Sequence, residues 1–288
     1  MINPVLRREL KTKLRTWKAP TLLIIYLLIL AGFGGMILLI SNVASHTNGF
    51  DPREALTVYS LIAGCQLGLI VLLVPALTSG SISGERERQT LDLLLITKQS
   101  PFSIIIGKLM SSISQIILLI LASTPIFSIV FMFGGVSLGN IVILFLFFIA
   151  TAIMIGSVGI FCSTYFKKTT TSTVIAYLFV LTLTIATVIT WAVFQQYSYI
   201  IRSTRLSYGE SLLIMGANPF VGFLSIVQEQ LGFDIIGEIF SVYNNPSSLN
   251  IAPWLVNLIF DGVITIILLF LSVIRIQPVM GKRNSKSR

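Results

Sequence analysis

The sequence is poor in charged residues, histidine and cysteine, and each shortage excludes a class of protein. Charged residues make up 11% of the 288 residues, whereas soluble domains carry about 25%. The single histidine, His46, excludes the zinc-protease motif, which needs two histidines. The two cysteines, Cys65 and Cys162, imply no disulfide framework.

Catalytic motifs are missing as well. The sequence holds no Gly-x-Ser-x-Gly nucleophile motif. Gly107-Lys108 resembles the end of a phosphate-binding loop, but Phe102 stands where that loop needs glycine and Leu109 where it needs Ser or Thr. We therefore expect no enzymatic activity, no catalytic residue, no metal site and no cofactor bound by this chain itself.

The sequence contains long hydrophobic runs, and 55% of its residues are hydrophobic. A helix needs roughly 20 apolar residues to cross a bilayer, and no run shows the alternation of a barrel strand. The fold class is therefore all-α, with residues 1–288 forming one multi-pass transmembrane domain of six helices. The predicted spans are Thr21–Ile40, Val58–Thr78, Leu109–Phe133, Leu138–Phe161, Val174–Phe194 and Trp254–Ile274.

The distribution of basic residues predicts the orientation. Six spans place both termini on one side, and of the 20 Lys and Arg residues only Arg53, Arg202 and Arg205 fall on the other side. Basic residues favour the cytoplasmic side, so we expect a cell-membrane protein with both termini in the cytoplasm. The net charge of +9 then indicates contact with anionic lipid and gives no support for nucleic-acid binding.

Residues 3–18 have the pattern of a basic amphipathic helix lying in the membrane interface. Apolar residues recur at three- and four-residue spacing, and basic residues fill the rest. The alternative is a basic flank that frays in solution. The residues assigned to this interfacial helix are Arg7, Arg8, Lys11, Leu14 and Trp17.

Residues 196–252 are predicted to be an external region holding two short amphipathic or re-entrant helices. Gly216 and Asn218-Pro219 interrupt an apolar stretch, and Asn-Pro is typical of a helix start. The alternative, a seventh span, would place the basic C-terminal tail outside. The apolar face expected for the second helix comprises Phe220, Phe223, Leu224, Val227 and Leu231.

Two features inside the spans are candidates for function. Asp261 lies well within the last span, where a carboxyl group is costly. It either lines a translocation path or serves as a proton-sensitive site, or it makes a structural hydrogen bond to a neighbouring helix or to Asn257. Gly64 and Gly68 form a Gly-x-x-x-Gly pair that favours close helix packing.

The stretch "SGERERQTLDLLLITKQSP", residues 83–101, concentrates charge and then apolar residues between two spans. Thr90 can cap a short helix, Asp92 suits its first turn, and Ser100-Pro101 starts the next helix. The leucine run is apolar nearly all round that short helix, so it needs the membrane interface or another protein to pack against.

This stretch, together with "NPVLRRELKTKLR" near the start, resembles the permease subunits of ATP-binding-cassette (ABC) transporters of the second exporter type. The resemblance implies that residues 84–98 are a coupling element docking in a groove of an ATPase subunit. Lys98-Gln99 departs from the Pro-type turn expected at its end. The residues implied in docking are Glu85, Arg86, Glu87, Arg88, Thr90, Leu91, Asp92, Leu93 and Leu94.

The function implied by the resemblance is the membrane subunit of an ABC exporter. Two permease chains, identical or paralogous, would form the path, and two ATPase subunits would bind ATP and Mg²⁺. An apolar path weakly favours lipid-like, peptide or drug-like cargo. The alternatives are a stand-alone channel or secondary transporter, for which repeats and several buried polar groups are expected, and a membrane anchor that recruits a cytoplasmic partner without transport.

Overall fold

The computed structural model describes residues 17–44, 52–91, 100–132, 136–203, 206–232 and 252–284, and all regular structure within these ranges is helical. The predicted interfacial helix therefore lies, except for its end, outside the described residues. The helices are α2 (Lys18–Ala44), α3 (Pro52–Thr78), α4 (Ser83–Glu87), α6 (Pro101–Ala122), α7 (Thr124–Met132), α8 (Leu138–Tyr165), α9 (Thr169–Arg202), α10 (Tyr208–Met215), α11 (Pro219–Leu231) and α13 (Pro253–Asn284).

Six helical segments are long and apolar enough to cross a membrane, which confirms the predicted number of spans. They are α2, α3 continuing through α4, α6 with the start of α7, α8, α9 and α13. The third begins at Pro101, earlier than the predicted Leu109, because Ser100 caps the helix by accepting from Ser103 N. That segment is interrupted at Ser123, two residues before Pro125.

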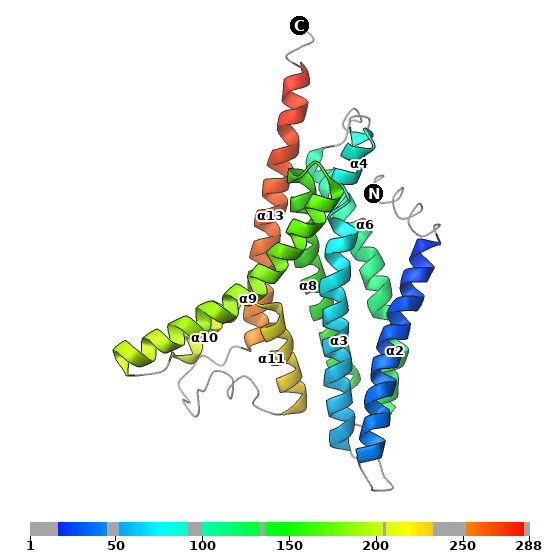
Figure 1. Ribbon diagram of the computed structural model, residues 1–288, viewed down its shortest axis with the longest axis vertical. Helices are drawn as coiled ribbons and strands as arrows, with labels where there is room; N and C mark the ends of the chain where they lie inside the picture. The colour runs from blue at the N-terminus through cyan, green and yellow to red at the C-terminus, as the bar shows by residue number, and fades with distance from the viewer. Residues whose placement is uncertain are drawn as a thin grey trace.

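α8 is the centre of the bundle and packs against α3, α6, α9 and α13 (Figure 1). Its sequence has no charged residue from Leu138 to Tyr165, and most of its side chains are buried. A helix that is apolar on every side is stable only when it is surrounded by other helices or by lipid. The core therefore forms around α8, and the other spans cover it.

α9 departs from this arrangement. It begins beside α4 and then diverges from the bundle (Figure 1), so that much of its surface carries exposed apolar side chains such as Leu178, Ile189 and Phe194. α2, at the other side of the bundle in this view, is also largely exposed and apolar. Such surfaces suit contact with hydrocarbon or with another membrane chain.

α10 and α11 follow α9 and are too short to cross a bilayer, with 8 and 13 residues. α11 begins at Pro219 after Asn218, whose side chain accepts from Phe220 N, so the predicted helix start is confirmed. α11 packs between α13, α8 and α3. Within the predicted apolar face, Phe223 and Val227 are buried, whereas Phe220 is exposed.

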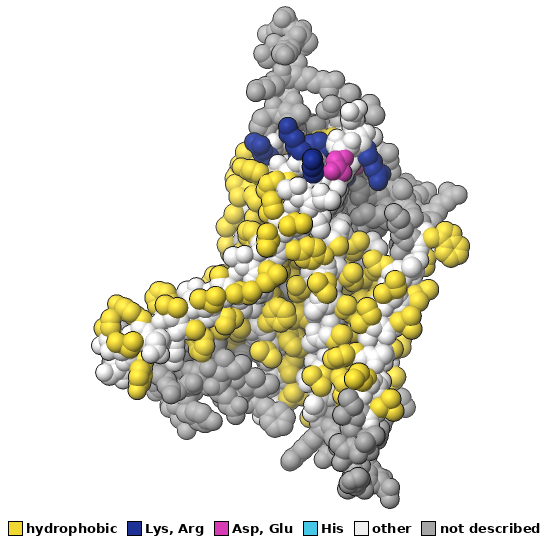
Figure 2. Space-filling view, in the orientation of Figure 1, with side chains coloured by type: hydrophobic (Ala, Val, Ile, Leu, Met, Phe, Trp, Pro, Cys, Tyr) yellow, Lys and Arg dark blue, Asp and Glu magenta, His cyan; other side chains and the backbone are white. Residues whose placement is uncertain are grey.

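Charged side chains gather at one end of the bundle, which we call the charged end (Figure 2). It comprises α4, the first turns of α6, the residues between α8 and α9, and α13 near Arg275. The guanidinium of Arg275 lies 4.8 Å from the centre of the Tyr165 ring. This cation–π contact joins α13 to the end of α8 at the charged end.

Candidate functional site

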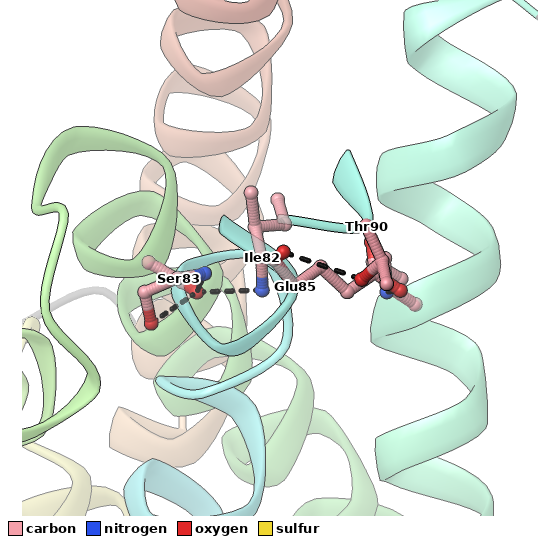
Figure 3. Close-up of polar contacts among 6 residues, drawn as sticks. Ile82, Ser83, Glu85 and Thr90 are labelled. Carbon is pink, nitrogen blue, oxygen red and sulfur yellow. Dashed lines mark hydrogen bonds and ion pairs between the residues drawn. The ribbon is translucent and has the colours of Figure 1, made fainter. Parts of the chain in front are cut away.

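The candidate site is the segment that follows α3, residues 79–91, which we call the α4 turn. The backbone N–H groups of Ile82 and Ser83 both donate to the Ser163 hydroxyl of α8, at 2.8 and 2.9 Å (Figure 3). N–H groups at a helix start lack an intrahelical acceptor. One serine on α8 therefore caps α4 and fixes where it begins.

Small side chains bring α3, α8 and α9 together beneath the α4 turn. Ser172 Oγ donates to Ser79 O at 2.8 Å, and the Ser79 and Thr173 hydroxyls are 2.7 Å apart. On α8, a Cβ added at Gly159 would overlap the Thr78 side chain and lie 3.2 Å from Ser79 N. Glycine is required at this position because the end of α3 approaches the α8 backbone directly.

Glu85 connects the α4 turn to α6. Its Oε1 lies 2.6 Å from Lys108 Nζ, and the Lys108 side chain is 2% exposed against 26% for Glu85. A buried ammonium is unfavourable unless it is paired, so the position of Lys108 depends on this carboxylate. The sequence predicted Glu85 as a docking residue and did not predict the contact with Lys108.

Arg86 and Glu87 connect the same turn to α8 and α9. The Arg86 guanidinium donates to the carbonyls of Thr164 (3.2 Å) and Phe166 (3.4 Å), where α8 ends. The Glu87 carboxylate accepts from Thr169 N (2.9 Å) and Thr169 Oγ1 (3.0 Å), where α9 begins. A cation at a helix C-terminus and an anion at an N-terminus both match the helix dipole.

The rest of the α4 turn faces outward. Arg88 is exposed, and Gln89 adopts a left-handed conformation with φ of 58° that ends α4. Thr90 then closes the turn, because its N–H and its hydroxyl both donate to Glu85 O. Leu91 is half-buried against the core. The α4 turn therefore presents its last residues on a support fixed to three helices.

Several predicted site residues lie outside the described residues: Arg7, Arg8, Lys11, Leu14, Asp92, Leu93 and Leu94. Their assignments stay predictions. Trp17, from the end of the predicted interfacial helix, is 86% exposed. Its carbonyl accepts from both the N–H and the hydroxyl of Thr21, so it lies at the start of α2.

Asp261 is buried in α13, with 2% exposure, and neither carboxylate oxygen has a hydrogen-bond partner among the described residues. Asn257, one turn earlier, donates from Nδ2 to Gly216 O at 2.8 Å, while its Oδ1 is also unpartnered within the described ranges. Of the glycine pair, Gly64 lies against the Phe223 ring of α11. A Cβ at Gly68 would meet nothing within 4 Å.

The sequence reasoning did not identify Lys108, Ser163, Gly159 or Thr169 as parts of the site. Each contacts the α4 turn from another helix, and Ser163 and Thr169 are separated from their partners by about 80 residues. The only local signal was the frequency of small residues in α8, where Gly156, Ser157, Gly159 and Ser163 follow one another closely. Such residues permit close helix approach but do not show which helix approaches.

Comparison with known proteins gives one match. The protein-family model described as ABC-2 type transporter matches residues 3–208, which is more than two thirds of the chain and includes the α4 turn. No curated protein matches the chain.

Proposed function

The chain belongs to the ABC-2 type transporter family, and from this premise we propose that it couples ATP hydrolysis by a separate ATPase subunit to export of a cargo. The family and the six apolar helices make the chain a multi-pass membrane permease subunit of an ABC transporter, and this family works with ABC ATPase partners. We further propose the coupling, the direction of transport and the class of cargo described below.

The observation that carries the proposal is the attachment of the α4 turn. Glu85, Arg86 and Glu87 bond to α6, α8 and α9, so a force applied to the turn acts on three spans together. Interfaces and packed helices change between discrete arrangements rather than deforming gradually. A partner that pushes on the turn would therefore move these spans as a group.

The docking surface that we propose begins at Arg88 and continues through the leucine run. Arg88 is exposed, and its charge would set partner choice and register rather than most of the affinity. The leucines after Thr90 would supply the affinity by burying apolar surface, at about 25 cal/mol per Å² before the costs of association. Glu85 and Glu87, which bond within the chain, would act mainly by holding the turn in place.

The remaining parts of the proposal follow from this arrangement. The charged end faces the cytoplasm, where the ATPase subunits bind ATP and Mg²⁺. Two permease chains pack together to enclose the path, and the exposed apolar surfaces of α2 and α9 are available for that contact and for lipid. The cargo is lipid-like, peptide or drug-like, since the spans offer few polar groups.

Co-purification with an ABC ATPase subunit from the same cell tests the proposal. We expect Leu91→Asp combined with Leu94→Asp to abolish complex formation, because charge on the leucine run prevents burial in an apolar groove. The matched control is Leu138→Asp, an exposed leucine at the start of α8, away from the charged end. Both variants must elute as folded protein, and an unchanged complex with the double variant contradicts the docking assignment.

A further inference from the structure

A group of buried oxygen atoms on α8 and α13 lacks hydrogen-bond donors. These atoms are Thr151 Oγ1, Asn257 Oδ1 and both carboxylate oxygens of Asp261, and none has a partner among the described residues. The three side chains are between 0% and 2% exposed. Buried polar atoms in folded proteins are nearly always bonded, so a cluster of unpartnered acceptors indicates a site that takes up a donor.

The two α13 side chains lie on one face of their helix. Asn257 and Asp261 are four residues apart, a spacing at which side chains are neighbours on a helix surface. Asn257 Oδ1 accepts no hydrogen bond from a described residue, although its Nδ2 is bound to Gly216 O. Asp261 is therefore the side chain that can reach this oxygen from one turn away.

The register of α8 against α13 places Thr151 at the depth of Asp261. The Arg275 guanidinium lies over the Tyr165 ring, so these two positions are close together where the helices reach the charged end. α8 and α13 run in the same direction (Figure 1). Residue 151 lies fourteen residues before 165, and residue 261 lies fourteen residues before 275. Because both helices rise by about 1.5 Å per residue, residues 151 and 261 lie at a similar depth.

A second contact supports the same register. Phe148 of α8 stacks on Phe223 of α11, with ring centres 6.3 Å apart. The neighbouring Gly222 lies directly against the Asn257 side chain of α13. α11 therefore holds residues 148 and 257 at one level, and Thr151 and Asp261 each follow about one turn later.

No described cation compensates a negative charge on Asp261. α8, the helix packed most extensively against α13, has no charged residue, and its other titratable groups are Cys162 and Tyr165 near the charged end. α11 contributes Glu229, which accepts from Trp254 Nε1. α10 contributes Tyr208 and Glu210, and Glu210 accepts from Ser207 N in its own helix cap.

The basic groups of the remaining neighbours are engaged elsewhere. Lys108 of α6 is paired with Glu85. On α13 itself, Arg275 lies over Tyr165 and is fourteen residues from Asp261, about 21 Å along the helix. An ionised Asp261 would thus be a buried charge without a described partner, which is a costly arrangement in a membrane span.

We propose that Asp261 is a proton-binding site in the interior of the bundle. The carboxylate takes a proton from water, and one O–H bond forms. The resulting carboxylic acid donates to Asn257 Oδ1. The Thr151 hydroxyl can donate to a carboxylate and to a carboxylic acid alike, so it does not depend on the proton. One proton thereby gives Asn257 Oδ1 a donor without leaving a charge in the core.

Protonation of Asp261 should also affect how firmly α10 and α11 pack against α13. Asn257 holds the turn between them through Gly216 O, and Gly222 of α11 packs on the same side chain. When Asp261 loses its proton, Asn257 Oδ1 faces a carboxylate in place of a donor. The two oxygens then repel each other, and the packing of α10 and α11 against α13 becomes weaker.

Carboxyl-labelled aspartate tests the protonation directly in the full-length chain in detergent micelles. The chain has four aspartates, Asp51, Asp92, Asp234 and Asp261, so carbon NMR should show four carboxyl signals. We expect one of them to be that of a carboxylic acid at neutral pH and to disappear in Asp261→Asn. If that variant does not fold, Asp51→Asn, Asp92→Asn and Asp234→Asn together identify the signal by elimination.

Two results would overturn this proposal. One is an ionised Asp261 at neutral pH. The other is a signal that changes with Na⁺ or K⁺ concentration at fixed pH, which would make the site one for a metal cation. Neither result bears on ATPase docking, which the leucine-run variants test separately.

Hydrogen exchange of residues 207–231 tests the link to α10 and α11. After correction for intrinsic rates, exchange in the unmodified chain should increase as the pH rises through the titration of Asp261. Asp261→Asn carries no charge and retains a donor for Asn257, so its exchange should not respond. The same pH response in both proteins contradicts the link.

Discussion

At the scale of single residues, the ion pair between Glu85 and Lys108 is asymmetric. Lys108 is 2% exposed, whereas Glu85 keeps 26% of its side chain accessible. The accessible part of Glu85 does not include Oε2, which is buried and has no hydrogen-bond partner among the described residues. Removing either partner should therefore leave an uncompensated charge on the other, and both removals should be costly.

We expect Glu85→Gln to destabilise the protein by about 3 kcal/mol, because it leaves the buried Lys108 ammonium without its carboxylate. Lys108→Met, which keeps most of the side-chain volume, should cost a similar amount, because it leaves the Glu85 carboxylate, with its buried Oε2, without a cation. Unfolding in detergent measures both, and the double variant should cost less than the sum of the two single variants, because it leaves no charge unpaired. Additive losses would contradict the coupling of the pair.

At the scale of elements, contacts from α8 determine the position of α4 more than the intrinsic stability of α4 does. A helix of five residues, Ser83–Glu87, is too short to be stable alone. Its first N–H groups are bonded by Ser163, and the Arg86 guanidinium reaches the carbonyls that end α8. α8 therefore acts as the base on which the α4 turn is built.

Ser163→Ala should release the α4 turn without unfolding the bundle. The substitution leaves the N–H groups of Ile82 and Ser83 without their acceptor, and each unmet buried group costs roughly 1–3 kcal/mol. Hydrogen exchange over residues 79–91 should become at least tenfold faster, as about 1.4 kcal/mol corresponds to a factor of ten. The matched control is Ser157→Ala on the same helix.

Ser157 is as buried as Ser163, but its hydroxyl donates to Met154 O within α8. Its removal should leave the exchange of residues 79–91 unchanged. If both variants accelerate exchange equally, Ser163 is not a specific anchor of the turn.

At the scale of the whole molecule, charge and apolar surface are separated. Most of the described charged side chains lie at the charged end (Figure 2), apart from Glu210, Glu229 and Asp261, while α2 and α9 carry exposed apolar side chains along their length. A largely basic end of this kind suits water, and the proposed orientation places it in the cytoplasm, which basic residues favour.

Cysteine labelling with a membrane-impermeant maleimide tests the orientation. In a chain with Cys65 and Cys162 replaced by alanine, Arg88→Cys should react in inside-out vesicles and be protected in intact cells. Gly139→Cys, exposed at the other end of α8, should show the opposite pattern. Reaction of Arg88→Cys with the reagent outside intact cells would contradict the proposed topology.

Much of the fold was predictable because its signals are local. The length of each apolar run gave the six spans, which the structure confirms. Ser100-Pro101 and Asn218-Pro219 mark the starts of α6 and α11 because a capping side chain and a proline with fixed φ act within one turn. The match to the ABC-2 type transporter family likewise confirms the resemblance drawn from the α4 turn and the N-terminal segment.

The contacts between helices were not predictable in the same way. A run that is apolar on every side, such as α8, gives no periodicity from which its buried face can be read. The apolar face predicted for α11 likewise did not show which residues would be buried, since Phe220 is exposed while Gly222 is packed against Asn257.

The sequence by itself determined the number of spans, the starts of α6 and α11 and the family of this protein, because hydrophobic length, capping and short motifs act over a few residues. Only the tertiary structure decided that Glu85 pairs with Lys108, that Glu87 bonds at the start of α9, and that Asn257 bonds Gly216 in the turn before α11. These contacts join residues on different elements, and their geometry depends on how the helices pack.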